Sequence, residues 1–361
     1  VVDAGHELDL LLAGSDPDAQ TAAAVHRVIR LPFTATRRPE RRRDQRLLAL
    51  RLAVRGGPSE LYDNSGARAA LEAGWPDETY DVVVIEHAGL APLVKHRRTG
   101  EHWICTLQNI ASGTASALRD LAPGRRQRLL VGREVQQAAG LERVAIEHND
   151  SDVTVSPDDG QLLPGPSTVV PNGVDLVAFS PSPVPRTPTL LFTGTLSYLP
   201  NVDGLQWFCR VVFPLVQAQV PDVVFHVVGR DPTPQIRALA DVPGIVLSAD
   251  VPSVKPFLAA SRVCVVPLRV GTGSRLKALE ALASGRPLVG TTVGPAGLGL
   301  TDQAVTADDP SALADAIVTL LLDDARADQL AAAGRQYVEE SFGWDSVARP
   351  LVEHLARVSP R

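Results

Sequence analysis

Residues 263–290 read VCVVPLRVGTGSRLKALEALASGRPLVG, and this stretch decides the fold class. It opens with an apolar, β-branched run at 263–267, and a second such run follows at 287–291; both have the length of a buried strand. Between them lie a glycine-bearing loop and a segment, 274–283, whose apolar residues recur at helical spacing. A strand, a loop, a helix and another strand predict a parallel α/β sheet.

The same alternation continues on both sides of this stretch. Further strands are expected at 7–13, 24–31, 80–86, 102–107, 152–156, 167–170, 189–194, 223–229, 244–247 and 304–306. Helices are expected at 41–54, 125–147, 202–219, 253–260 and 311–322, with a helical end at 325–358 interrupted near 342–343. We therefore predict two Rossmann-like, doubly wound α/β domains.

A proline-rich segment separates the two series of strands. Residues 171–188 read PNGVDLVAFSPSPVPRTP, and closely spaced prolines disfavour both a helix and a central strand. We predict an N-terminal domain at 1–170, a linker at 171–188 and a C-terminal domain at 189–342. A length of 361 residues suits two domains of ordinary size.

The composition argues against several classes of protein. A net charge of −6 disfavours a nucleic-acid binder. The three cysteines, Cys105, Cys209 and Cys264, have no metal-ligand spacing, so we expect buried thiols, no metal site and a cytoplasmic location. No apolar run approaches about 18 residues, which predicts no transmembrane helix. The chain has no Met and begins like the tail of a helix, so we expect an N-terminal truncation.

The loop at 271–274 has the features of an anion site. Gly271 and Gly273 flank Thr272 and let the backbone approach a ligand closely. Ser274 is expected to cap the following helix, whose N-terminus favours phosphate through its free N–H groups and dipole.

Basic side chains follow this loop at once. Arg275 and Lys277 oppose the helix dipole, so a nearby anion would explain them. Glu280 shares a face with Lys277 and would reach the ribose hydroxyls of a bound nucleotide. The alternative is a surface helix with a solvated Lys277–Glu280 pair.

The chain resembles family-four retaining glycosyltransferases of the GT-B fold. Within that family it is most similar to bacterial members that act in polysaccharide or natural-product glycosylation. The matching segments are VVPNGVD at 169–175, LLFTGTLSYLPNVDGLQWF at 190–208, FHVVGRDP at 225–232, PFLAASRVCVVPLRVGTGSRLKALEALASGRPLV at 256–289, TTVGPAGL at 291–298 and SFGWDSVARPLVEHL at 341–355. The resemblance implies two domains facing across a cleft, with a closing helix, 343–361, that packs back on the first domain.

The resemblance also implies roles for individual residues. Glu280 matches the glutamate that holds the donor ribose, whereas Thr272 replaces the family's earlier glutamate. Arg275 and Lys277 match the pair that binds the diphosphate, and a second basic pair expected near 196–201 is missing. The remaining nucleotide-binding candidates are Gly194, Arg230 and the loop residues Pro295, Ala296 and Gly297. Arg230 fits a solvated loop arginine equally well.

The first domain is expected to hold the acceptor and the reacting side of the sugar. Gln108 occupies the place of a histidine found in many relatives, next to Asn109, and cannot carry a charge. His87 follows the preceding strand and is a second candidate, or a structural histidine. By the same resemblance, the family's first strand and its glycine-bearing loop would precede residue 1.

Residues 37–55 carry eight arginines opposed only by Glu40 and Asp44. In membrane-associated relatives such helices contact anionic lipid, which predicts peripheral membrane contact. A solvated helix in an arginine-rich protein is the alternative.

These observations predict transfer of a hexose or related sugar from a nucleoside diphosphate sugar to an acceptor hydroxyl, without a cofactor. The resemblance implies that the anomeric configuration is retained and that no metal is needed. A non-catalytic nucleotide-sugar binder and a sugar-nucleotide epimerase of the same fold remain as alternatives. A dehydrogenase is disfavoured, because no GxGxxG with a downstream acidic residue opens either domain.

Overall fold

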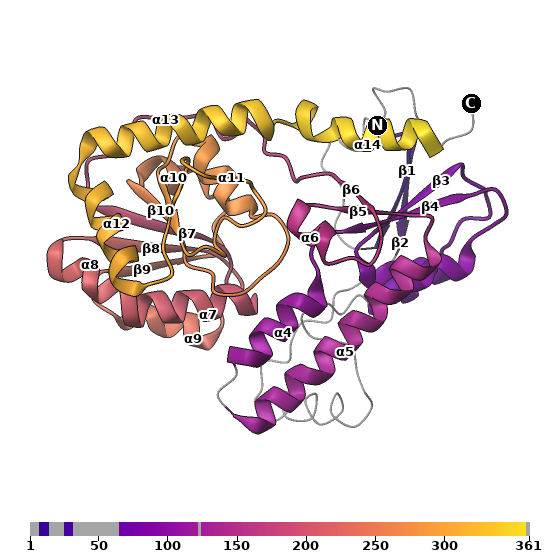
Figure 1. Cartoon of the computed structure of the whole chain (residues 1–361), viewed down its shortest axis with the longest axis horizontal. Coiled ribbons are helices and arrows are strands. Elements are labelled where there is room, and N and C mark those ends of the chain that lie inside the picture. The colour runs from indigo at the N-terminus through magenta and orange to yellow at the C-terminus, as the bar shows by residue number, and fades with distance from the viewer. Residues whose placement is uncertain (1–6, 14–24, 32–64, 122–123, 359–361) are drawn as a thin grey trace. The chain divides into compact units, whose positions relative to one another are not determined.

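The computed structural model describes residues 7–13, 25–31, 65–121 and 124–358. It divides the chain into two units, residues 1–170 with 348–361 and residues 171–347. The described strands pair in parallel in both units, and helices connect them (Figure 1). This arrangement confirms the predicted α/β class with two parallel sheets.

The second unit contains a six-stranded sheet in the order β12-β11-β10-β7-β8-β9. Its strands are β7 (Thr189–Thr195), β8 (Val224–Arg230), β9 (Ile245–Ala249), β10 (Val263–Val266), β11 (Leu288–Gly290) and β12 (Val305–Thr306). The chain runs outward from β7 to β9 and then returns to β10 on the other side of β7. The strand order therefore reverses between β7 and β10, where open α/β sheets bind ligands beyond the carboxyl ends of the strands.

Alternation along β7 separates two apolar cores. Leu190 and Phe192 face one core, and Leu191 faces the other. The first core is covered by α7 (Leu199–Trp207), α8 (Phe213–Gln219) and α12 (Pro310–Leu322), and the second by α10 (Lys255–Ala260), α11 (Leu276–Ala283) and the end of α13 (Asp324–Ser341) (Figure 1). Short helices α9 (Pro234–Arg237) and η4 (Ala238–Asp241) follow β8.

The expected helix at 202–219 is interrupted. A π-helical turn, η3 (Phe208–Val212), separates α7 from α8, and the N–H of Phe213 bonds to the carbonyl of Phe208. Pro214 follows this turn and has no N–H to continue the α-helical ladder. The prediction of one continuous helix was therefore wrong in this detail.

Two buried arginines anchor the proline-rich segment 171–188 within the second unit. Arg286 donates to the backbone carbonyls of Ser182 and Pro183, and Arg262 donates to that of Pro185 at 3.0 Å. Neither arginine is exposed to solvent. The segment thus obtains its hydrogen bonds from side chains, since its prolines cannot form a regular ladder.

The first unit contains a four-stranded sheet of β3 (Val82–Glu86), β4 (His102–Leu107), β5 (Ser151–Thr154) and β6 (Ser167–Val169), in that order. Two further strands, β1 (Asp9–Ala13) and β2 (Arg27–Leu31), pair with each other. The helices are α3 (Ser65–Ala73), η2 (Ala88–His96), α4 (Ala111–Leu121), α5 (Arg125–His148) and α6 (Pro157–Gln161). The expected helix at 41–54 lies outside the described residues.

The last helix, α14 (Trp344–Val358), contributes to both units. Val347 packs in the second unit, whereas Leu355 packs against Ile104 and Val153 in the first. His354 lies between two strands there, with its ring nitrogens 2.9 Å from Ser151 Oγ and 3.1 Å from Thr168 Oγ1. The family resemblance implied that a closing helix at 343–361 packs back on the first domain, and we propose that α14 is this helix.

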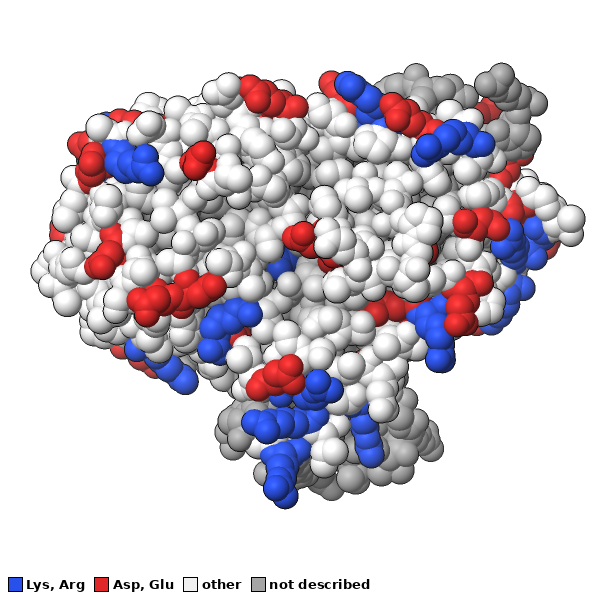
Figure 2. All heavy atoms as spheres, in the orientation of Figure 1, with Lys and Arg blue, Asp and Glu red and all other residues white. Residues whose placement is uncertain are grey.

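Several Lys and Arg side chains lie close together in the first unit, on the face that Figure 2 shows. Figure 2 shows Lys and Arg side chains over the region where α4 ends and α5 begins. Arg125, Arg128 and Arg133 of α5 are exposed there. Within the described ranges, no helix combines the length and apolar character needed to cross a bilayer.

Candidate functional site in the second unit

The loop between β10 and α11 turns through two glycines in left-handed conformations. Gly271 has φ +137° and Gly273 has φ +81°, values that side-chain-bearing residues rarely adopt. A Cβ on Gly271 would also lie 3.0 Å from Nη2 of Arg275. The backbone conformation therefore favours glycine at 271, and any side chain there would press on the guanidinium of Arg275.

Arg275 folds back over this loop. Its buried guanidinium donates to the carbonyl oxygens of Thr272 and Gly273, the latter at 2.7 Å. Helix α11 begins at Leu276, and Arg275 is its N-cap residue, with φ −100° and ψ 86°. A guanidinium thus lies at the start of a helix, beside a loop that turns through two glycines.

The prediction that Ser274 caps α11 is wrong. The helix begins one residue later than expected, so Ser274 precedes the N-cap position. Its hydroxyl instead accepts a hydrogen bond from Nδ2 of Asn172 at 2.7 Å. This contact ties the loop to the PNG sequence at 171–173.

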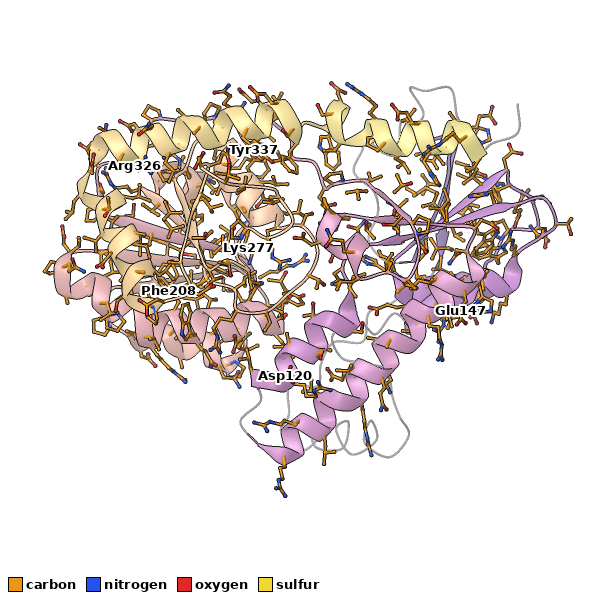
Figure 3. All side chains as sticks on the ribbon, in the orientation of Figure 1. Asp120, Glu147, Phe208, Lys277, Arg326 and Tyr337 are labelled. Carbon is orange, nitrogen blue, oxygen red and sulfur yellow. The ribbon has the colours of Figure 1, made fainter. Side chains whose placement is uncertain are left out.

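Lys277 lies in the first turn of α11 (Figure 3). Its amine lies beside Gly194, at the carboxyl end of β7. Its amine donates to Oδ1 of Asn201 at 2.7 Å and lies 4.0 Å from the centroid of the Phe192 ring. A Cβ on Gly194 would lie only 2.8 Å from the same amine. The glycine at the end of β7 therefore makes the space that the amine occupies.

The surroundings of Lys277 disfavour its charged form. Burial, together with the nearby charge of Arg275, lowers the pKa of the amine to about 7, although Glu280 opposes this shift. Burial raises the pKa of Glu280 in turn. Within the part of the chain that the structure describes, no ion pair joins Lys277 to Glu280, and the amine bonds to the neutral Asn201. This geometry contradicts the alternative of a solvated surface pair.

The sequence analysis missed Asn201. Its side chain is 4% exposed, and its Nδ2 donates to the carbonyl of Thr195 at 2.8 Å. The available signal was its spacing, since Asn201 precedes the buried Leu205 by four residues and shares its helical face.

Two other predicted residue sets follow neighbouring strands. Arg230 is exposed at the end of β8, where its Nε donates to Oγ1 of Thr195 at 3.3 Å. The turn Pro295, Ala296 and Gly297 follows β11, and Gly297 has φ +80°. The preceding Gly294 lies so close to β10 that a Cβ would meet the carbonyl oxygen of Val266 at 2.2 Å.

The second unit therefore brings its predicted residues to one edge of its sheet. A small cavity there is lined by Leu191, Thr193, Cys264, Val265, Val266 and Lys277. Glycine backbones, a helix start and two cationic side chains at one edge are suited to binding a polyphosphate group. Among the described residues, no cluster of His, Cys, Asp and Glu has the arrangement of a metal site.

The predicted residues of the first unit, His87 and Gln108, directly follow the neighbouring strands β3 and β4. Nε2 of Gln108 donates to Oε2 of Glu86 at 3.2 Å, and the same oxygen accepts from the hydroxyl of Thr106. His87 is exposed, and its backbone has φ 75° and ψ 140°. This conformation is strained for a residue other than glycine, and such strain often marks functional sites. The sequence analysis did not single out Glu86.

Comparisons with known proteins place this geometry in a family. Residues 187–323 match the model of the family described as "Glycosyl transferases group 1". The chain is 30% identical over 339 residues to the D-inositol 3-phosphate glycosyltransferase of Xylanimonas cellulosilytica, covering 82% of this chain and 75% of that protein. It is 24% identical over 269 residues to the lipopolysaccharide core biosynthesis mannosyltransferase LpsB of Rhizobium meliloti, covering 68% of this chain and 76% of the relative.

Solved structures share the fold. Sucrose-phosphate synthase of Thermosynechococcus elongatus superimposes with a TM-score of 0.72 at 20% identity, over 99% of this chain and 90% of that one. HepE of Anabaena, solved in complex with UDP, gives 0.63 at 14% identity, over 98% and 100% of the two chains. Both comparisons confirm the GT-B fold. The family match over residues 187–323 and the relative from Xylanimonas show that this chain belongs to the group 1 glycosyltransferases, which are retaining, nucleotide-sugar-dependent enzymes.

Proposed function

We propose that this chain is a hexosyltransferase that moves a hexose from a nucleoside diphosphate sugar to an acceptor hydroxyl. The mannosyltransferase LpsB and the UDP complex of HepE support this finer assignment. One observation on the chain itself carries the assignment of a diphosphate donor. The Lys277 amine lies at the switch point of the sheet with a neutral hydrogen-bond partner, Asn201.

The energetics of this amine favour an anionic ligand. A cation that is removed from water is costly unless an opposite charge compensates it, and the lowered pKa of Lys277 reflects that cost. A diphosphate beside Lys277 and Arg275 would supply the missing negative charge. The same two cations would then stabilise the diphosphate as its bond to the anomeric carbon breaks. Their charge would take the place of a metal ion.

Other residues would complete the donor site. Glu280 would accept hydrogen bonds from the ribose hydroxyls. The backbone of Gly271, Thr272, Gly273 and Ser274, that of Pro295, Ala296 and Gly297, and the ends of β7 and β8 at Gly194 and Arg230 would surround the nucleotide. In the first unit, Gln108 and His87 would face the reacting sugar and the acceptor. The arginine-rich segment 37–55, proposed to contact anionic lipid, lies outside the described residues.

A ligand panel tests the donor assignment. UDP, GDP, ADP and dTDP, with their glucose and mannose conjugates, would be added at millimolar concentration in a thermal-shift assay with and without EDTA. A ligand at 100 times its Kd stabilises the folded protein by about 2.7 kcal/mol. We expect at least one nucleotide to raise Tm in EDTA, and the Lys277→Met variant to lose this shift. If no nucleotide raises Tm, the donor site is wrongly assigned.

Product analysis tests the transfer. Incubation of the stabilising sugar nucleotide with candidate acceptors should yield a glycoside whose anomeric configuration, measured by NMR, matches that of the donor. Binding without turnover of any acceptor would favour the non-catalytic alternative. Conversion of the sugar nucleotide into its epimer would favour the epimerase.

A further inference from the structure

We propose that Asn201 is a positioning residue of the donor site. Its side chain holds the Lys277 amine in place against the carboxyl end of β7. This inference rests on the proposed function, because it specifies how the lysine that would bind the diphosphate is oriented. No basic residue follows β7 in the segment 196–201, so the amide at 201 stands where a cation was expected from the family resemblance.

The orientation of the Asn201 amide is fixed by its two partners. Its Nδ2 donates to the backbone carbonyl of Thr195 at 2.8 Å, and a carbonyl can only accept. Oδ1 must therefore point the other way, where it accepts from the Lys277 amine at 2.7 Å. The side chain is 4% exposed, so water competes little for either bond.

Lys277 needs a hydrogen-bond partner because its other contacts do not fix the position of the amine. The amine lies against the face of the Phe192 ring and the backbone of Gly194, and its four-carbon chain has many rotamers. Within the described part of the chain, Asn201 supplies the one hydrogen bond to this amine. Because the amide is neutral, it fixes the position of the amine without neutralising its charge, which stays available to an anion.

A double-mutant cycle tests the proposal. Kd for UDP, with GDP and ADP in parallel, would be measured by titration calorimetry for wild type, Asn201→Ala, Lys277→Met and the double variant. We expect Asn201→Ala to raise Kd about tenfold in the wild-type background. In the Lys277→Met background it should have no further effect, because the amide acts through the amine.

A matched control separates positioning from general damage. Asn149 also donates from its Nδ2 to a backbone carbonyl, that of Ala145 at 2.7 Å, in the other unit. Asn149→Ala should leave the nucleotide Kd unchanged. If Lys277→Met leaves Kd for all three nucleotides unchanged, the proposed donor site fails. Two outcomes would overturn the positioning role alone. In the first, Lys277→Met weakens nucleotide binding and Asn201→Ala does not. In the second, Asn201→Ala raises Kd by the same factor in the wild-type and Lys277→Met backgrounds.

A second variant decides the question should Asn201→Ala not fold. Asn201→Asp loses the bond to the Thr195 carbonyl, because an ionised carboxylate cannot donate, but it keeps an oxygen towards Lys277. It also adds a negative charge, which raises the pKa of the amine. The other titratable groups nearest to it, Arg275, Glu280 and Cys264, are unchanged. The pH above which UDP binding weakens should therefore rise by about one unit or more. An unchanged pH profile would overturn the positioning role.

Discussion

The amine of Lys277 lies 4.0 Å from the centroid of the Phe192 ring, where a cation meets the negative face of an aromatic side chain. This contact favours the charged amine, whereas burial and Arg275 favour the neutral one and lower its pKa to about 7. The protonation state of Lys277 is therefore sensitive to any charge that binds nearby.

Binding of UDP should be accompanied by proton uptake. At pH 8 the free amine is largely neutral, and a diphosphate beside it raises the pKa and draws in a proton. The measurement is calorimetry in HEPES and in Tris at pH 8, since the binding enthalpy then differs with the ionisation enthalpy of the buffer. Lys277→Met should abolish this difference. Equal enthalpies for wild type in both buffers would contradict the prediction.

Replacing Gly194 by alanine should disrupt the donor site. The new Cβ would lie 2.8 Å from the Lys277 amine and 3.0 Å from Nδ2 of Asn201, so the amine must move. We expect kcat/KM to fall about 10- to 100-fold, because the lysine end must swing away. Tm should fall as well, because the backbone at position 194 has φ +154°, which strains an alanine. Gly140→Ala is the control, since open space surrounds that helical position and alanine should stabilise it by about 0.5–1 kcal/mol. Wild-type kcat/KM in Gly194→Ala would exclude this arrangement.

Arg286 should contribute to the stability of the fold and not to ligand binding. It is fully buried and donates to the carbonyls of Ser182, Pro183, Ser261 and Ser284. Arg286→Met leaves these acceptors unsatisfied, and we expect about 2–4 kcal/mol lower free energy of unfolding in urea. The matched change Arg326→Met, at an exposed position, should cost less than about 0.5 kcal/mol. Similar losses in both variants would refute the anchoring role.

Gln108 should affect turnover and not nucleotide binding. It lies in the first unit and donates to Glu86, whereas the donor candidates lie in the second unit. For Gln108→Ala we expect kcat to fall about tenfold with an unchanged Kd for UDP. Glu86→Gln tests the neighbouring carboxylate in the same way. A weakened UDP Kd in Gln108→Ala would place this residue at the nucleotide instead.

The contact of α14 with the first unit should weaken in acid. Burial, Arg357 and His102 lower the pKa of His354 from its ordinary 6.5. A histidine with a lowered pKa contributes stability that is present above about pH 6.5 and lost as the pH falls through the lowered value, because the unfolded chain binds the proton more readily. Wild type should thus lose more free energy of unfolding between pH 7 and 5 than His354→Gln. Parallel pH curves for the two proteins would show that His354 is not responsible.

Much of the fold could be predicted because strands and helices are encoded over short distances. The strand predicted at 102–107 coincides with β4, and the expected break near 342–343 falls between α13 and α14. The glycines of the 271–273 loop were identified because a residue without a side chain lets the backbone approach a ligand closely. Their positive φ values came only from the structure. The N-cap of α11 was misplaced by one residue, at Ser274 in place of Arg275, and the hydroxyl of Ser274 bonds instead to Asn172, about a hundred residues away.

The sequence by itself determined the α/β class, the order of elements and the candidate loop, because periodicity, glycine and proline act on their immediate neighbours. Only the tertiary structure decided which side chains meet. Asn201 and Lys277 are 76 residues apart, and they touch because α7 and α11 follow β7 and β10, which are neighbours in the sheet. Such a pairing depends on strand order and burial across the whole unit, and no local pattern carries it.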